Sequence, residues 1–262
     1  MNTTLVTALY DIGRSDWGPL FTRPMETYLR YLENILSLDT NIVIFIDSTY
    51  YDYILKIRSR IDPDLTKTRI ILKTFEELDT YKQFYYKTKE VMNSDFFKNH
   101  LIEPHVPEAL YPKYNIINFN KVSFIEEVID KNYFNSDYFM WIDAGFWHEN
   151  FPKEYLNNIY PNEEKIKVLD DNKVHFLSLC KDEDVVLSSC FDPRVSIAGS
   201  MFAGKAEPLL KFKKLCYFVI EQFLNKGAIN DDQTIYAFAY KKNKELFNLK
   251  QGNWFDNFKF YI

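Results

Sequence analysis

Short apolar runs alternate with amphipathic stretches along the first half of this chain. The runs are rich in β-branched and aromatic residues, as in the buried strands of a parallel sheet. Between them, apolar residues recur every three or four positions, which predicts helices. This order predicts βαβ units, and therefore a mostly parallel central sheet flanked by helices. Strands are expected at residues 5–10, 41–46, 69–72 and 138–142, and helices at residues 24–38, 50–61, 75–98 and 115–130.

The remaining segments are less regular. Three prolines at positions 104, 107 and 112 predict a loop, and Gly199 interrupts an apolar run that otherwise reads as a strand. Since no internal repeat or flexible linker separates the segments, we expect a single α/β domain over residues 1–262. Further strands are expected at residues 175–179, 185–189 and 197–202, and further helices at residues 208–224 and 232–242.

The most informative run is YFMWI at residues 138–142, because it ends abruptly in Asp143, Ala144 and Gly145. Ligands of open α/β sheets bind in the crevice outside the carboxyl ends of the strands. The two small residues leave room for a ligand to approach the backbone. Asp143 therefore either binds a divalent cation or a ribose hydroxyl, or it caps the following turn.

Composition narrows the function classes. The chain has 262 residues, enough for one large α/β domain, and its 47% hydrophobic content is ordinary for a globular protein. The net charge of −5 argues against a general nucleic-acid surface, which needs a basic stripe. It leaves open a small anionic ligand held by a few well-placed cations. Three cysteines without CxxC spacing, Cys180, Cys190 and Cys216, predict reduced thiols.

The N-terminal segment lacks the basic start and long apolar core of a signal peptide. No apolar run approaches the roughly 18 residues of a spanning helix. We therefore expect a soluble, cytoplasmic protein without a transmembrane segment, with peripheral membrane association left open.

Three basic side chains are candidates for a site near Asp143. Arg14 follows a glycine at the exit of the first strand, where its guanidinium either pairs with a phosphate or is solvated. Lys121 lies on the helix that leads into the 138–142 strand, so it lies either over the same crevice or in solvent. His148 either completes a metal site with Asp143 or belongs to the surface of a loop.

Residues 230–233 (NDDQ) stand at the start of a predicted helix. Acidic residues are favoured there by capping and by the helix dipole. Alternatively, one of these carboxylates faces a sugar or acts as a general base. Gly199 marks a place where the backbone bends or approaches another group closely. Trp254 either stacks on a ligand ring or anchors the C-terminal segment.

The segments TALYDIGR, KVSFIEEVI, FMWIDAG, IAGSMFAG and NDDQTIYAFAY follow one another in this order over nearly the whole chain. In order and spacing they resemble the bacterial HtrL/YibB (WlaTC-like) proteins, a family associated with lipopolysaccharide and surface-glycan gene clusters. The resemblance implies a GT-A-like (Rossmann-like) fold. Residues 1–145 would then form the nucleotide-sugar-binding half, and residues 146–262 the acceptor-side half.

The resemblance also assigns roles to the candidate residues. The segment 143–145 falls where GT-A enzymes carry their DxD metal motif, but Gly145 replaces the second aspartate. A divalent cation, Mn²⁺ or Mg²⁺, is then held by Asp143 with help from His148, or the site works without a cation. Asp143 and Asp232 are the expected catalytic carboxylates. Donor-binding residues are expected to be Thr7, Tyr10, Asp11, Arg14, Lys121, Asp143 and Gly145, and acceptor-binding residues Gly199, Asp231, Gln233 and Trp254.

The implied activity is that of a hexosyltransferase-like glycosyltransferase in surface polysaccharide or lipopolysaccharide biosynthesis. It would move a sugar from a nucleotide-diphospho-sugar, with a UDP-sugar favoured, to a glycan or glycolipid acceptor. Glycosyl transfer needs a neutralised diphosphate leaving group and a carboxylate near the anomeric carbon. The alternative is a non-catalytic glycan- or nucleotide-binding module with a GT-A-like fold. A nucleotidyltransferase is disfavoured, because no Gly-rich phosphate loop follows the first strand.

Overall fold

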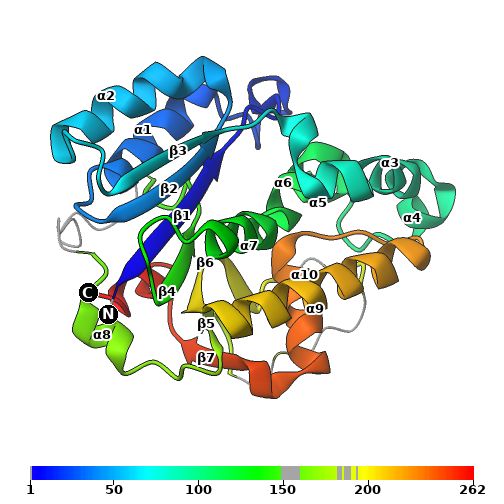
Figure 1. Cartoon of the computed structure of the whole chain (residues 1–262). Coiled ribbons are helices and arrows are strands. Elements are labelled where there is room, and N and C mark those ends of the chain that lie inside the picture. The colour runs from blue at the N-terminus through cyan, green and yellow to red at the C-terminus, as the bar shows by residue number, and fades with distance from the viewer. Residues whose placement is uncertain (1, 149–159, 182–184, 186–189, 193) are drawn as a thin grey trace.

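The computed structural model describes residues 2–148, 160–181, 185, 190–192 and 194–262. Within these residues one seven-stranded sheet runs through the molecule in the order β3-β2-β1-β4-β6-β5-β7 (Figure 1). Four of the strand pairs are parallel, and only β6 runs antiparallel to its neighbours β4 and β5. The predicted α/β fold with a mostly parallel sheet is therefore confirmed. The strands are β1 (Thr3–Leu9), β2 (Asn41–Ile46), β3 (Thr68–Leu72), β4 (Tyr138–Ile142), β5 (Val174–Ser178), β6 (Ile197–Lys205) and β7 (Phe247–Gln251).

The carboxyl ends of β1 and β4 lie at the same edge of the sheet. The two strands are parallel neighbours, with Val6 of β1 paired with Trp141 of β4. The segments that follow them, residues 10–24 and 143–148, therefore leave the sheet side by side. β6 begins at this edge, since its Met201 pairs with Ile142 at the end of β4. Three stretches that are far apart in the sequence thus meet at one place.

Helices cover both faces of the sheet (Figure 1). Successive side chains of a strand point to opposite faces, so the sheet supports two hydrophobic clusters. Val6 and Trp141 belong to the cluster that includes residues of α7, α9 and α10, while Leu5 and Met140 belong to the one that includes residues of α1 and α2. The helices are α1 (Met25–Leu36), α2 (Tyr51–Ile61), α3 (Asp79–Asn93), α4 (Asp95–His100), α5 (Pro107–Leu110), α6 (Pro112–Phe119), α7 (Lys121–Lys131), α8 (Glu163–Lys167), α9 (Ala206–Asn225), α10 (Asp232–Lys242) and α11 (Asp256–Lys259).

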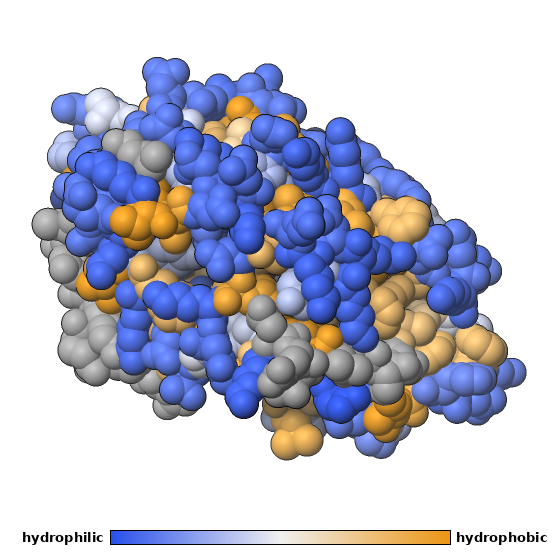
Figure 2. Space-filling model, turned by 90° about the horizontal axis from the view of Figure 1, so that it is seen from below, coloured by the Kyte–Doolittle hydropathy of each residue, from blue (hydrophilic) through white to orange (hydrophobic). Residues whose placement is uncertain are grey.

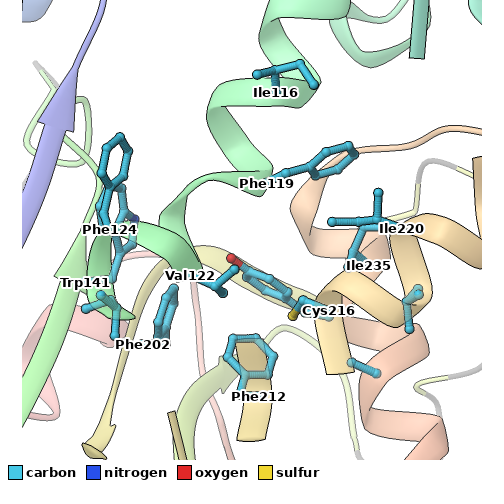
Figure 3. Close-up of a cluster of buried hydrophobic side chains, with 14 of the residues drawn as sticks. Ile116, Phe119, Val122, Phe124, Trp141, Phe202, Phe212, Cys216, Ile220 and Ile235 are labelled. Carbon is cyan, nitrogen blue, oxygen red and sulfur yellow. The ribbon is translucent and has the colours of Figure 1, made fainter. Parts of the chain in front are cut away.

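Aromatic packing fixes α7 against the sheet (Figure 3). Phe124 of α7 stacks on Trp141 of β4, with ring centroids 5.8 Å apart. Phe202 of β6 meets Phe212 of α9 edge to face, with centroids 5.6 Å apart. All four side chains are buried, and each such burial contributes about 1.5–3 kcal/mol to stability. The first residue of α7, Lys121, therefore has a fixed place at the sheet edge.

The prediction of one continuous helix over residues 75–98 is wrong. The segment consists of a short 3₁₀ turn at Phe75–Glu77 followed by α3 and α4. Ser94 separates α3 from α4 because its backbone is extended, and its Oγ accepts a hydrogen bond from the Phe97 amide at 3.1 Å. A serine that ends one helix also caps the next, as N-cap residues do.

The helix expected over residues 115–130 is likewise two helices, α6 and α7, which meet at Asn120. The Asn120 side chain accepts hydrogen bonds from the amide and the hydroxyl of Thr80, at 3.1 Å and 2.9 Å. Two of the three prolines expected to mark a loop instead begin helices, because Pro107 starts α5 and Pro112 starts α6, whereas Pro104 lies between α4 and α5 as expected. Proline suits the first helical turn, where its missing N–H costs no hydrogen bond.

The interruption expected at Gly199 does not occur, because β6 continues through it from Ile197 to Lys205. The glycine instead allows the Asp232 side chain to lie close to the backbone of β6. A Cβ at this position would lie only 2.1 Å from Oδ2 of Asp232. The strand expected at residues 185–189 falls almost entirely outside the described residues. The other expected strands and helices are confirmed, with ends that shift by a few residues.

Within the described part of the chain, no helix is both long enough and apolar enough to span a membrane. On the face shown in Figure 2, hydrophobic side chains are interspersed among hydrophilic ones.

Candidate functional site

A cavity of about 380 Å³ opens at the sheet edge where β1 and β4 end and β6 begins. Its lining comes from both halves of the chain, as the topology requires. Most of the site residues expected from the sequence line it, whereas Thr7 and Asp231 do not. The expected residues found in the lining are Tyr10, Asp11, Arg14, Lys121, Asp143, Gly145, His148, Gly199, Asp232, Gln233 and Trp254.

Lys121 stands at the centre of the polar lining. Its Nζ lies 2.8 Å from Asp232 Oδ2 and 2.9 Å from Asp143 Oδ1, and it donates to the carbonyl of Gly199 at 3.2 Å. An ammonium has three N–H donors, and these three acceptor groups use all of them. The interactions tie together the start of α7, the end of β4, the start of α10 and β6.

In this group one buried ammonium is shared by two carboxylates. Lys121 is only 5% exposed, and burial alone would lower its pKa, but Asp143 and Asp232 raise the pKa above the usual lysine value. Burial raises the pKa of Asp143, an effect that Lys121 opposes. The Trp141 indole N–H donates to Asp143 Oδ1 at 2.7 Å. We call Lys121, Asp143 and Asp232 the lysine group.

Asp231 and Asp232 are adjacent but differ in role. Asp231 caps α10, since its Oδ1 accepts from the Thr234 amide at 3.1 Å and its Oδ2 from the Gln233 side chain at 3.0 Å. Burial, with the neighbouring Asp232 and Glu108, raises the pKa of Asp231 to about 7. The capping interpretation therefore describes Asp231, and the cavity-facing interpretation describes Asp232.

Of the site residues expected in and after the first strand, some line the cavity and one does not. Thr7 is fully buried within β1 and does not reach the cavity, which corrects its expected place in a donor site. Tyr10 lines the cavity while its ring stacks on Phe124, with centroids 6.1 Å apart. Asp11 is exposed, and its Oδ1 accepts from the Gly13 amide at 2.8 Å, which shapes the turn into Arg14.

A second charged group, Arg14, Arg23 and Tyr28, lines the cavity wall formed by residues 10–28. Arg14 donates through Nη1 to the Tyr28 hydroxyl and through Nη2 to the Phe21 carbonyl at 3.3 Å. Arg23 donates to the same Tyr28 hydroxyl at 3.3 Å. We call these three residues the arginine group. Both guanidiniums therefore end within hydrogen-bonding distance of one oxygen atom.

The residues described do not fit the divalent cation expected at Asp143. Both Asp143 oxygens already face the Lys121 ammonium, so a cation bound there would lie against a positive charge. The His148 ring packs near Tyr31 and Phe255, with centroids 6.3 Å and 5.0 Å away. Among the residues the structure describes, no three His, Cys, Asp or Glu side chains gather as a metal site.

Sequence reasoning missed several residues of the cavity lining. Tyr28 stands at the spacing of an apolar helix face, and Arg23 stands before a proline with no motif around it. Ser200 is 3% exposed, and its hydroxyl has no hydrogen-bond partner among the described residues. The same holds for the Asn118 side-chain nitrogen. Buried polar atoms are usually paired, so unpaired ones in a cavity lining indicate a place for a polar ligand.

The solved structures with a similar chain include two enzymes. Mouse xyloside xylosyltransferase 1 in its apo form aligns over 95% of this chain and 84% of its own, with a TM-score of 0.48 and 11% identity. The 4-diphosphocytidyl-2C-methyl-D-erythritol synthase of Anaerococcus prevotii aligns over 98% of this chain and 90% of its own, with a TM-score of 0.39 and 12% identity. Both similarities are weak.

Sequence comparison gives a closer match. The chain is 26% identical to protein HtrL of Escherichia coli strain K12 over 98% of its own length and 92% of that protein. The profile of the HtrL_YibB family, described as bacterial proteins of unknown function, matches residues 1–262. The match covers the whole chain and agrees with the resemblance seen in its motifs. The chain therefore belongs to the HtrL_YibB family.

Proposed function

We propose that the chain binds a nucleotide-diphospho-sugar in the cavity and transfers its sugar to a glycan or glycolipid acceptor. The observation that carries this proposal is a difference in ion pairing between two parts of the cavity lining. Guanidiniums without a carboxylate partner among the described residues stand on one wall, and the Asp143 and Asp232 carboxylates stand on another. A diphosphate suits the first wall, and a sugar with its hydroxyls suits the second.

The leaving group is the part of the donor that needs positive charge. When the bond between the anomeric carbon and the diphosphate oxygen breaks, negative charge develops on the diphosphate. Arg14 is placed to stabilise it, since a planar guanidinium pairs well with phosphate oxygens. Lys121 was expected to bind the donor, but we propose a different role for it. Because its three donors are used within the protein, it positions Asp143 and Asp232 instead.

The carboxylates then serve the sugar side of the reaction. The Asp143 side chain is 32% exposed, so it has room to accept a hydrogen bond from a ribose or sugar hydroxyl. Asp232 lies deeper and would face the sugar or the acceptor. The acceptor oxygen forms the new bond to the anomeric carbon, and its proton passes to a carboxylate or to the leaving diphosphate.

Titration calorimetry with UDP and GDP tests the binding half of this proposal. We expect saturable binding of at least one of them, with UDP favoured. Release of UDP from a panel of UDP-hexoses in the presence of saccharide acceptors tests the transfer half. If neither nucleoside diphosphate binds, in the presence or absence of Mn²⁺, the proposal is wrong.

A non-catalytic nucleotide- or glycan-binding module is the second candidate. The ion pairs that hold both carboxylates on Lys121 favour it, because a paired carboxylate is a poorer base. Asp232→Asn discriminates between the two functions. For an enzyme the variant loses turnover but keeps nucleotide binding, whereas for a binding module the glycan profile of the producing cells is unchanged. Asp64→Asn, at an exposed position away from the cavity, is the matched control.

A further inference from the structure

The two arginines of the cavity meet on a single tyrosine hydroxyl. Arg14 and Arg23 both donate to Tyr28, and Arg14 also lies over the Trp17 ring, with its Cζ 4.7 Å from the centroid. Neither arginine forms an ion pair with a carboxylate of the described residues. Two positive charges are thus held together without an ion pair to a described carboxylate, and their mutual repulsion costs free energy that a bound anion would offset.

The arginines keep donors for such an anion. A guanidinium carries five N–H donors in a planar fork. Arg14 uses two of its N–H groups in contacts within the protein, and Arg23 uses one. The Nε of Arg14 is buried and has no partner among the described residues. The unused donors on the pair suit the several oxygens of a diphosphate.

Tyr28 also fills the space beside Gly145. A Cβ at Gly145 would lie 3.0 Å from Cε1 and 3.4 Å from Cδ1 of Tyr28. A carboxylate side chain at position 145 would therefore meet the tyrosine ring. Tyr28, which accepts hydrogen bonds from both arginines, thus occupies the space that the second acid of a DxD motif would need.

The remaining acid of that motif is already paired with a lysine. Both oxygens of Asp143 face the Lys121 ammonium, at 2.9 Å and 3.1 Å, and Oδ1 also accepts from the Trp141 indole. A divalent cation would have to displace these contacts or bind next to a lysine. The described residues around Asp143 thus disfavour a divalent cation. The two guanidiniums beside Tyr28 carry the same total positive charge as that cation would.

We infer that Arg14 and Arg23, positioned by Tyr28, neutralise the diphosphate of the donor in place of a divalent cation. The inference rests on the proposed function, because it assigns the cation role at the same donor site. The two guanidiniums bind the diphosphate oxygens directly and stabilise the charge that develops there during transfer. Nucleotide binding and sugar transfer are then independent of metal.

Calorimetric titration of UDP and GDP into the full chain, once with EDTA and once with Mn²⁺, tests this inference. We expect the Kd in EDTA to equal that in Mn²⁺ within about threefold, since no metal contact is gained or lost. The Arg14→Ala/Arg23→Ala double variant should bind about 100-fold more weakly in both buffers, because charge-assisted hydrogen bonds to phosphate are lost. Arg60→Ala, on the exposed side of α2, is the matched control and should leave the Kd unchanged.

The single variant Arg23→Lys keeps the charge but not the fork, and its Kd should fall between those of the parent and the double variant. Circular dichroism of each variant establishes that it is folded. Binding that EDTA abolishes and Mn²⁺ restores would overturn the inference and leave the proposed function standing. Unchanged binding by the double variant in EDTA would also overturn it. If no nucleoside diphosphate binds in either buffer, the proposed function fails and the inference fails with it.

Discussion

The lysine group and the arginine group face the same cavity but are built in opposite ways. Lys121 is buried between two carboxylates and a carbonyl, so its charge is compensated within the protein. Arg14 and Arg23 meet on a tyrosine hydroxyl without a carboxylate among the described residues. A compensated charge stabilises the fold, whereas an uncompensated one is available to a ligand. We therefore expect substitutions in the first group to affect stability most, and those in the second to affect binding.

The largest loss of stability is expected for Lys121→Met. Removing the ammonium leaves the buried Asp232 carboxylate and the partly exposed Asp143 carboxylate as unpaired like charges, which should lower the free energy of unfolding by about 3–5 kcal/mol. Urea unfolding at pH 7 measures this loss of free energy. Lys214→Met, at an exposed position of α9, is the control and should change stability by less than about 0.5 kcal/mol. A loss below about 1 kcal/mol for Lys121→Met would show that the lysine group does not hold the site together.

A smaller but substantial loss is expected for Gly199→Ala. The new methyl group would lie 2.1 Å from Asp232 Oδ2, so the carboxylate must move away from Lys121. We expect stability to fall by about 2 kcal/mol, as for other steric insertions into packed sites, and transfer activity to fall with it. Gly18→Ala is the matched control, because a Cβ there meets no atom within 4 Å. Equal stability of the two variants would contradict the close approach of β6 to α10.

The effect of Asp231→Asn should depend on pH. Because the folded-state pKa of Asp231 is raised to about 7, its contribution to stability is present at acidic pH and is lost as the pH rises toward 7. Asparagine still caps α10 but never ionises. The variant should match the parent near pH 4 and exceed its stability at pH 8 by more than about 1 kcal/mol. Thermal unfolding across this range measures the difference, and a constant difference would contradict the assigned shift.

The smallest change in stability is expected for Arg23→Ala. Its side chain makes one hydrogen bond and contacts the Tyr28 ring, with its Cζ 5.3 Å from the ring centroid, so the free energy of unfolding should change by less than about 0.5 kcal/mol. Nucleoside diphosphate binding should nevertheless weaken about tenfold. Urea unfolding and calorimetry on the same samples compare the two effects. A large loss of stability with unchanged binding would reverse the contrast between the two groups.

Much of the fold could be predicted because its signals are local. Strand and helix geometry directly predicts the apolar runs of β1, β2 and β4 and the periodic face of α9. The start of α10 is predicted by its capping residues instead, because this helix is buried on most sides. The break at Ser94 also has a local signal, because serine is a preferred N-cap and its partner Phe97 is three residues away. The break at Asn120 could not be predicted, because it depends on hydrogen bonds to a residue far away in the sequence. The Asn120 side chain accepts hydrogen bonds from Thr80, which belongs to α3 and lies 40 residues earlier in the chain. No sequence pattern near position 120 indicates that partner.

The candidate site was predictable for charged residues near the ends of strands or at the starts of helices. Arg14, Lys121, Asp143 and Asp232 were expected and all line the cavity. Tyr28 and Arg23 were not expected, because a tyrosine at helical spacing indicates a core face and an isolated arginine indicates solvent. Their role follows from the tertiary approach of α1 to Gly145, which sequence spacing does not encode.

The most direct test of the central claim is a crystal structure of the chain with UDP and Mn²⁺ both present. The account predicts that the diphosphate lies within hydrogen-bonding distance of Arg14 and Arg23, with the contacts of Lys121 to Asp143 and Asp232 retained. It also predicts no anomalous manganese peak between Asp143 and the diphosphate. A manganese ion that bridges Asp143 to the diphosphate, or UDP bound away from this cavity, would contradict it.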